Sequence, residues 1–255
     1  MTVVATVGTT HPLSFAGLTF AALTLAADAV RPVCIVAGVS AQDAARVTAR
    51  APVDPATIRA QFDALHDIAI GAFHVGALLS AESVHAVASA LAAFPDTPVV
   101  VDPVLATSSG DPLADAATCA AIREVLLPRA TLVTPNLAEA SALLGRAVTD
   151  LPAMREAAGE LVSLGATAAL VKGGHLAGDP VDVVADERGV RELRGTRIDA
   201  QLRGTGDLLA VTIAAHVARG ASLAEAVESG RRHVRDAIAR GVAFAATRVA
   251  PLGNG

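Results

Sequence analysis

The chain of 255 residues contains neither tryptophan nor tyrosine, and only 18% of its residues are charged. Without these two aromatic residues, an aromatic cage or a base-stacking platform is not expected. The net charge of −5 argues against a nucleic-acid partner, which requires a basic surface. The only two cysteines, Cys34 and Cys119, lie in apolar runs without the spacing of a zinc site. We expect both thiols to be buried, in a reducing compartment.

The N-terminal region also lacks the features of a targeting or anchoring segment. Its first charged residue is Asp28, so the positively charged start of a signal peptide is missing. Pro12 and Asp28 interrupt the early uncharged stretch before it is long enough to span a membrane. We therefore expect a cytoplasmic protein with no membrane partner.

Apolar residues make up 53% of the chain and are arranged in alternating strand and helix patterns. The predicted strands are residues 2–7, 31–40, 70–78, 97–104, 130–136 and 167–175. The predicted helices are residues 18–29, 56–65, 81–93, 115–126, 137–144 and 153–164. This alternation is typical of parallel βαβ units, and continuous apolar strands indicate a sheet that is covered on both faces.

The last third of the chain departs from this rhythm. Residues 181–199 predict a β-hairpin, and the chain after Gly206 is predicted to be helical to about Ala245, with a break near Gly220. Because no repeat or low-complexity linker is present, we expect one α/β domain over residues 1–255.

Polar and glycine-rich segments follow four of the predicted strands: GTTH at 8–11, DP at 102–103, TPN at 134–136 and KGGH at 172–175. Open parallel sheets bind ligands outside the carboxyl ends of their strands. The sequence therefore predicts the functional site at this edge of the sheet.

The segment from Gly204 to Asp207, GTGD, begins a predicted helix. Glycines allow close approach of a ligand to the backbone, and the N–H groups of a helix start attract anions. Asp207 beside them is suited to accept the proton of an attacking hydroxyl group during phosphoryl transfer. The alternative is that Asp207 caps the helix, and these four residues alone leave both open.

Three further motifs also have two interpretations each. Asn136 and Glu139, three residues apart, share one helix face and suit a hydrated Mg²⁺, but they also fit a capping box. Asp102 ends a buried strand and needs a partner such as a cation or a lysine, unless it is a turn residue. Lys172 suits a nucleotide phosphate, unless it extends from a strand edge towards solvent.

The order and spacing of these motifs resemble the ribokinase-like superfamily of small-molecule kinases. Between residues 68 and 240, the chain is most similar to hydroxymethylpyrimidine/phosphomethylpyrimidine kinases and to pyridoxal kinases. The resemblance implies a three-layer αβα fold with a mostly parallel sheet, ATP and Mg²⁺ as cofactors, a small-molecule substrate and a homodimer. It implies that Asp207 is the general base and that Gly204, Thr205 and Gly206 form its anion hole.

The remaining roles that the resemblance implies concern three groups of residues. Those for ATP are Lys172, Thr134 and Asn136. Those for the metal are Glu139 and Asp102. Those for the substrate are Gly8, Thr10, His11, Gln42 and Val104.

The chain departs from the family pattern at two places. Pyrimidine kinases of this type carry cysteine at the position of Asp207, and residues 8–22 lack the family's glycine-rich loop. In that loop His11 is either a substrate contact or an ordinary loop residue, and Phe15 lies either against the substrate ring or in the core. The resemblance favours a hydroxymethylpyrimidine, free or phosphorylated, as the substrate. The alternatives are pyridoxal and a non-catalytic ligand-binding relative.

Overall fold

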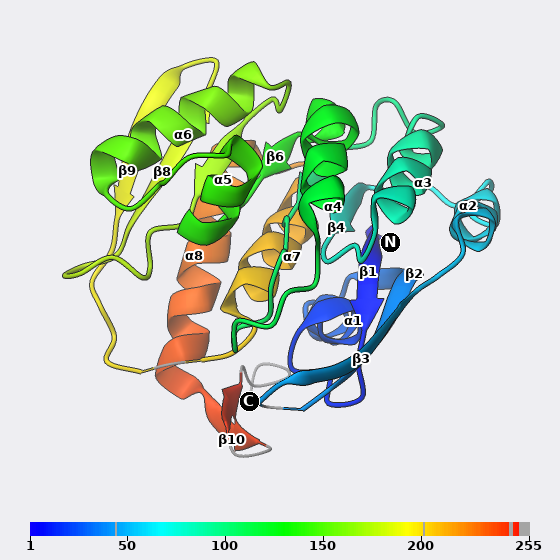
Figure 1. Ribbon diagram of the computed structural model, residues 1–255, viewed down its shortest axis with the longest axis horizontal. Coiled ribbons are helices and arrows are strands. Elements are labelled where there is room, and N and C mark those ends of the chain that lie inside the picture. Colours follow the sequence, from blue (N-terminus) through cyan, green and yellow to red (C-terminus); the bar gives the residue numbers. More distant parts are fainter. Residues whose placement is uncertain (44, 201, 245–246, 250–255) are drawn as a thin grey trace.

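A mostly parallel sheet runs through the molecule (Figure 1). The computed structural model describes residues 1–43, 45–200, 202–244 and 247–249. The strands of this sheet are β1 (Val3–Thr10), β2 (Arg31–Gln42), β3 (Val47–Pro52), β4 (Ala72–Val75), β5 (Val99–Val101), β6 (Leu132–Val133), β7 (Ala169–Val171), β8 (Val181–Asp186) and β9 (Gly189–Arg194). They lie in the order β3-β2-β1-β4-β5-β6-β7-β8-β9. Neighbours from β2 to β7 are parallel, and β3, β8 and β9 pair antiparallel.

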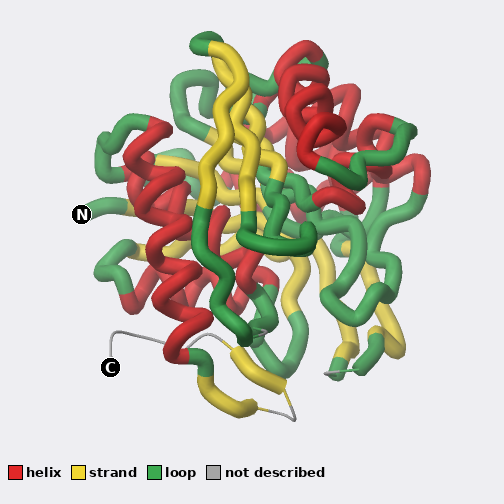
Figure 2. Tube along the Cα trace, turned by 90° about the vertical axis from the view of Figure 1, so that its left-hand side faces the viewer, coloured by secondary structure: helices red, strands yellow, loops and turns green. Residues whose placement is uncertain are grey.

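Helices cover both faces of the sheet, as the edge-on view in Figure 2 shows. On one face lie α1 (Gly17–Ala27), α7 (Thr205–Ala218) and α8 (Leu223–Arg240). On the other face lie α2 (Pro55–Asp63), α3 (Ala81–Leu91), α4 (Ala116–Ala121), α5 (Leu137–Leu144) and α6 (Leu151–Ser163). A π-helical turn (Ile122–Leu126) and a 3₁₀ turn (Leu127–Arg129) follow α4. The expected three-layer αβα fold is confirmed.

The central strands contribute side chains to two separate cores. In β4, Phe73 and Val75 pack with the cluster under α2 to α6, whereas Ala72 packs with the cluster under α1, α7 and α8. Successive side chains of a strand point to opposite faces, so both must be apolar when both faces are covered. This explains why the strands are continuous apolar runs in the sequence.

The structure corrects the end of the last helix. The expected helix to about Ala245 ends at Arg240, and β10 (Val242–Phe244) and β11 (Thr247–Val249) form an antiparallel hairpin, while Ala245 itself lies outside the described residues. The helix ends because Gly241 has extended backbone angles (φ −46, ψ 137), and Gly241 lies against Leu202. The expected break near Gly220 is confirmed, at a left-handed φ of +87.

A second correction concerns strand β3 and the cysteines. Residues 47–52 form a strand although their side chains are largely exposed, so no apolar pattern predicted it. This strand pairs only with residues 38–42 of β2, which leaves Cys34 at an open sheet edge. Cys34 is therefore exposed and Cys119 half-buried, so the expectation of two buried thiols was wrong. In the described part of the chain, no helix combines the length and apolarity needed to span a bilayer.

Candidate active site

Three polar side chains continue an apolar face of the sheet at its carboxyl edge. Val100, Leu132 and Leu170 belong to the core beneath α7, and two residues further along their strands stand Asp102, Thr134 and Lys172. Because side chains two residues apart share a face, the alternation directs all three polar groups towards the start of α7. The alternation of side chains along these strands is thus consistent with a site at the carboxyl edge of the sheet, as expected.

Asp102 is the centre of this polar group and is 1% exposed. Its Oδ1 atom accepts hydrogen bonds from Lys172 Nζ at 2.8 Å and from Thr134 Oγ1 at 2.9 Å. The predicted partner of Asp102 is therefore a lysine. Lys172 does not extend from a strand edge into solvent, since its side chain is 15% exposed and is held in this pair.

Asn136 and Glu139 form the capping box that the sequence allowed. The Asn136 side chain accepts from the Glu139 N–H at 2.9 Å, and Glu139 Oε2 accepts from the Asn136 N–H at 2.7 Å. The same Oε2 atom lies 4.0 Å from Lys172 Nζ. Glu139 therefore both caps α5 and belongs to the charged cluster around Lys172.

Helix α7 begins beside the Asp102–Lys172 pair. Its N-cap residue is Gly204, in a left-handed conformation with φ +77, so Asp207 lies in the first turn and is not the N-cap. A Cβ atom on Gly206 would lie 3.2 Å from Lys172 Nζ and 3.5 Å from Asp102 Oδ2. A side chain at this position would require Lys172 to shift by a few tenths of an ångström, so glycine eases the close approach of the helix start to the charged pair.

Negative charge exceeds positive charge in this cluster. Burial, followed by the charge of Asp102, raises the pKa of Asp207 to about 7, while a hydrogen bond from the backbone of Gly17 opposes the rise. Burial also raises the pKa of Glu139 to about 7, against the opposing effect of Lys172. Burial lowers the pKa of Lys172, but Asp102 and Glu139 outweigh it and leave that pKa above its usual value. Three carboxyl groups around one ammonium group favour the entry of a further cation.

The cluster is not a closed metal chelate. Among the residues that the structure describes, no three acidic, histidine or cysteine side chains converge on a common point. Mg²⁺ is usually bound by one or two carboxylates, with waters and substrate phosphates completing its shell. The oxygen donors of Glu139 and Asp102 fit that mode.

His74 is a buried polar residue of this region that the sequence analysis missed. Its Nδ1 atom pairs with Thr6 Oγ1 at 2.9 Å, and its Nε2 atom is buried without a hydrogen-bond partner. Burial, offset in part by Asp102, lowers the pKa of His74 to about 4, so the ring is neutral. Its position within the apolar strand segment AFHV was the available signal.

The predicted substrate residues near β1 lie beside the cluster. Gly8 packs against the backbone of Ala77, and the Thr10 hydroxyl bonds to that of Thr19 at 2.7 Å. His11 follows the end of β1 and is 7% exposed. Phe15 is 3% exposed, which confirms it as a core residue.

Gln42 and Val104 are the two remaining predicted substrate residues, and Val104 shares an apolar cluster with Ala77, against which Gly8 packs. Gln42 ends β2, and its Oε1 atom accepts from Ser40 Oγ at 3.3 Å. Val104 packs in an apolar cluster with Val47 of β3 and Leu113. Over residues 1–43, 45–200, 202–244 and 247–249, no hydrogen bond or ion pair connects Gln42 with Asp207.

We expect Gly204→Ala to destabilise the protein by at least about 2 kcal/mol, measured by urea unfolding. Its φ of +77 disfavours any side chain, and the new Cβ would lie 2.4 Å from the Phe15 carbonyl oxygen. Gly220→Ala is the matched control, because Gly220 shares the left-handed conformation at φ +87 but has open space around its Cβ position. That variant should lose only about 1 kcal/mol. Equal losses in the two variants would contradict the close packing of Phe15 on Gly204.

Comparison with known proteins was made for both sequence and structure. A family model described as phosphomethylpyrimidine kinase matches residues 14–251. The hydroxymethylpyrimidine/phosphomethylpyrimidine kinase of Streptomyces coelicolor is 38% identical over 223 residues, covering 87% of this chain and 80% of that protein. Bacillus subtilis pyridoxal kinase in its ADP complex matches with a TM-score of 0.90 and 26% identity, over 99% of this chain and 97% of that one. Clostridium difficile phosphomethylpyrimidine kinase matches with a TM-score of 0.83 and 25% identity, over 93% and 100% of the two chains.

Proposed function

Since the chain belongs to the phosphomethylpyrimidine kinase family, and is thus an ATP-dependent kinase of an alcohol group, we propose a hydroxymethylpyrimidine, free or monophosphorylated, as its acceptor. One observation carries the catalytic part of this proposal. The buried carboxyl group of Asp207 has a pKa of about 7 and lies in the first turn of a helix that begins beside Lys172. A group that gains and loses a proton near neutral pH is suited to general-base catalysis.

In this proposal Asp207 accepts the proton of the substrate hydroxyl group at a carboxylate oxygen. The N–H groups of Gly204, Thr205 and Gly206 stabilise the negative charge that develops as the phosphoryl group moves. Because the carboxylate and the N–H groups come from one helix turn, the base and the anion hole keep a fixed relation to each other.

ATP would supply the phosphoryl group, and Mg²⁺ bound here would neutralise part of the charge on its phosphates. We assign Glu139 and Asp102 to the metal, and Lys172, Thr134 and Asn136 to the nucleotide. The excess of carboxyl groups over the one ammonium group supports the metal part of this assignment, since a divalent cation would offset the negative charge of the cluster. Lys172 then exchanges part of its bond with Asp102 for a phosphate oxygen.

The substrate side is assigned to Gly8, Thr10, His11, Gln42 and Val104. The position of the first three, beside the start of α7, supports their part of this assignment. Pyridoxal is the second candidate acceptor, and it is favoured by the carboxylate at position 207 and by the match to a pyridoxal kinase over 99% of the chain. A homodimer, a cytoplasmic location and a single domain over residues 1–255 stay predictions.

A coupled assay of ADP release tests the proposal. We expect kcat/KM for the hydroxymethylpyrimidine to exceed those for pyridoxal, pyridoxine and sugars, and the analogue with a methyl group in place of hydroxymethyl is the control without an acceptor. Higher kcat/KM for pyridoxal would transfer the proposal to that substrate. ATP binding without turnover of any alcohol would contradict it and favour a non-catalytic ligand-binding protein.

A further inference from the structure

His11 is a buried side chain whose ring nitrogens are not satisfied by well-formed hydrogen bonds. The residue is 7% exposed, and neither Nδ1 nor Nε2 makes a hydrogen bond of normal geometry, although the Ala16 backbone lies close enough to raise the pKa of the ring. Buried polar atoms are nearly always paired, and leaving one unpaired costs more than a hydrogen bond contributes. A side chain that bears this cost at the edge of a candidate active site suits a role in ligand binding.

The segment around His11 lies directly against the proposed catalytic helix start. The Phe15 carbonyl oxygen faces Gly204, where a Cβ would lie only 2.4 Å away. The backbone of Gly17 contributes a hydrogen bond to the Asp207 carboxylate. A Cβ on Gly17 would lie 3.9 Å from His11 Cδ2, the ring carbon bonded to Nε2. Gly17 thus lies next to both the His11 ring and the Asp207 carboxylate.

The orientation of His11 is fixed by its neighbour Phe15. The two ring centroids lie 4.8 Å apart with an angle of 55° between the ring planes, and Phe15 is itself buried. Burial lowers the pKa of His11, although the Ala16 backbone offsets part of this effect. The imidazole at neutral pH is therefore uncharged, with one nitrogen that donates and one that accepts.

We propose that His11 is a specificity-determining residue that binds, through Nε2, a ring nitrogen or a ring-borne amino or hydroxyl group of a heteroaromatic alcohol. This inference rests on the proposed kinase function and identifies how the site recognises the ring that carries the reacting hydroxymethyl group. An uncharged imidazole selects an uncharged hydrogen-bonding edge, whereas a carboxylate or ammonium group there would select a charged one.

A substrate–protein cycle tests this role. His11→Phe keeps a ring against Phe15 but removes both nitrogens, and His11→Gln places an amide group near the position of Nε2. The substrates are the hydroxymethylpyrimidine and analogues in which one ring nitrogen is CH or the amino group is hydrogen. We expect His11→Phe to raise KM for the parent pyrimidine about tenfold, with kcat and KM for ATP nearly unchanged. For the analogue that lacks the group contacted by His11, wild type and His11→Phe should have the same KM. His11→Gln should restore most of the affinity for the parent pyrimidine.

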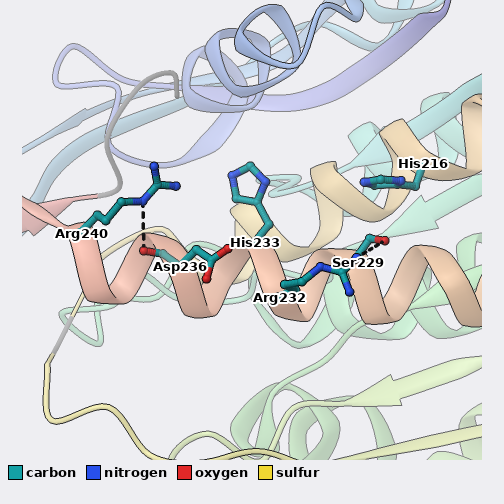
Figure 3. Close-up of a pocket in the computed structure, with 6 residues that line it drawn as sticks. All are labelled: His216, Ser229, Arg232, His233, Asp236 and Arg240. Atoms are coloured by element: carbon teal, nitrogen blue, oxygen red, sulfur yellow. Dashed lines mark hydrogen bonds between the residues drawn. The ribbon is translucent and has the colours of Figure 1, made fainter. Parts of the chain in front are cut away.

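His216→Phe is the matched control. His216 lines a small pocket between α7 and α8 together with Ser229, Arg232, His233, Asp236 and Arg240 (Figure 3). It lies nine residues beyond Asp207 on α7, about 14 Å along the helix axis. This variant should leave both KM values unchanged.

Calorimetric titration of wild type and His11→Phe with the same pyrimidines, in the presence of a non-hydrolysable ATP analogue, separates the two proposals. Turnover with an unchanged KM in His11→Phe, or an equal penalty on every analogue, would overturn the role of His11 alone. Binding without turnover would overturn the kinase function, and the ratio of Kd values would then decide the role of His11. Neither binding nor turnover by the wild type would overturn both.

Discussion

Asp207→Asn is expected to lower kcat at pH 8 by about a thousandfold while leaving the Kd for ATP nearly unchanged. The amide keeps the size and position of the carboxyl group but accepts no proton. Because burial raises the pKa of Asp207 to about 7, kcat/KM of the wild type should rise with pH and level off above about 7. Steady-state kinetics between pH 5.5 and 9 and a nucleotide-binding titration measure these effects. Turnover by the variant within tenfold of wild type would exclude Asp207 as the base.

The same substitution should stabilise the fold at pH 8. A carboxyl group whose pKa is raised on folding is harder to ionise in the native state, so its presence lowers stability as pH rises from about 4 to about 7. The penalty is absent below the pKa of the unfolded chain and is constant above about 7. Asp207→Asn removes it, and we expect an increase of about 1 kcal/mol or more in the free energy of unfolding at pH 8.

Asp182→Asn is the control for this stability effect. Asp182 Oδ2 accepts a hydrogen bond from Arg231 at 2.9 Å, and its Oδ1 accepts from the Gly173 N–H at 3.0 Å. Its neutralisation should therefore destabilise the protein. Urea unfolding of both variants at pH 5 and pH 8 gives the comparison. A loss of stability in Asp207→Asn at pH 8 would contradict the claim that burial makes the ionised Asp207 destabilising.

Lys172→Met is expected to destabilise the protein by about 3–5 kcal/mol. The substitution removes the cation that lies 2.8 Å from Asp102 Oδ1 and 4.0 Å from Glu139 Oε2, and so leaves buried carboxylates without their partner. The double variant with Asp102→Asn should recover part of the loss, because the unpaired charge is then absent as well. Urea unfolding of the single and double variants measures this coupling.

Arg146→Met is the control for the ion pair. Arg146 lies 2.9 Å from Glu160, but its side chain is 34% exposed. Exposed ion pairs contribute at most about 1 kcal/mol, so this variant should be much less affected. A Lys172→Met variant no less stable than Arg146→Met would show that the buried pair adds nothing beyond a surface contact.

Much of the fold follows from patterns within the sequence. The apolar runs of β1 and β4 identify strands because nearly all of their positions are buried beneath helices on the two faces of the sheet. Strand β3 has no such requirement, because it is an exposed edge, and its pairing with β2 is a tertiary event that local pattern does not encode. Gly241, where α8 ends, likewise lies against Leu202, a residue far from it in the sequence.

The candidate site shows the same division. Asp102 was predicted to have a partner because an unpaired buried carboxylate is costly, and the structure identifies it as Lys172, from a strand two places along the sheet. His74 was not predicted, since its neighbours in the sequence give no sign that Thr6 of the adjacent strand supplies a hydroxyl group. A single segment of the sequence thus shows that a buried polar residue needs a partner. It does not show which residue of another segment supplies that partner.

The alternation of side chains along β5, β6 and β7 has a consequence for how this protein can diverge. Asp102 shares its face with Val100, and Lys172 shares its face with Leu170, each across a spacing of two residues. Inserting or deleting one residue within such a strand would turn the polar group to the opposite helical layer. The chemistry of the site is therefore free to vary by substitution, whereas changes of length are tolerated only in the loops beyond these strand ends.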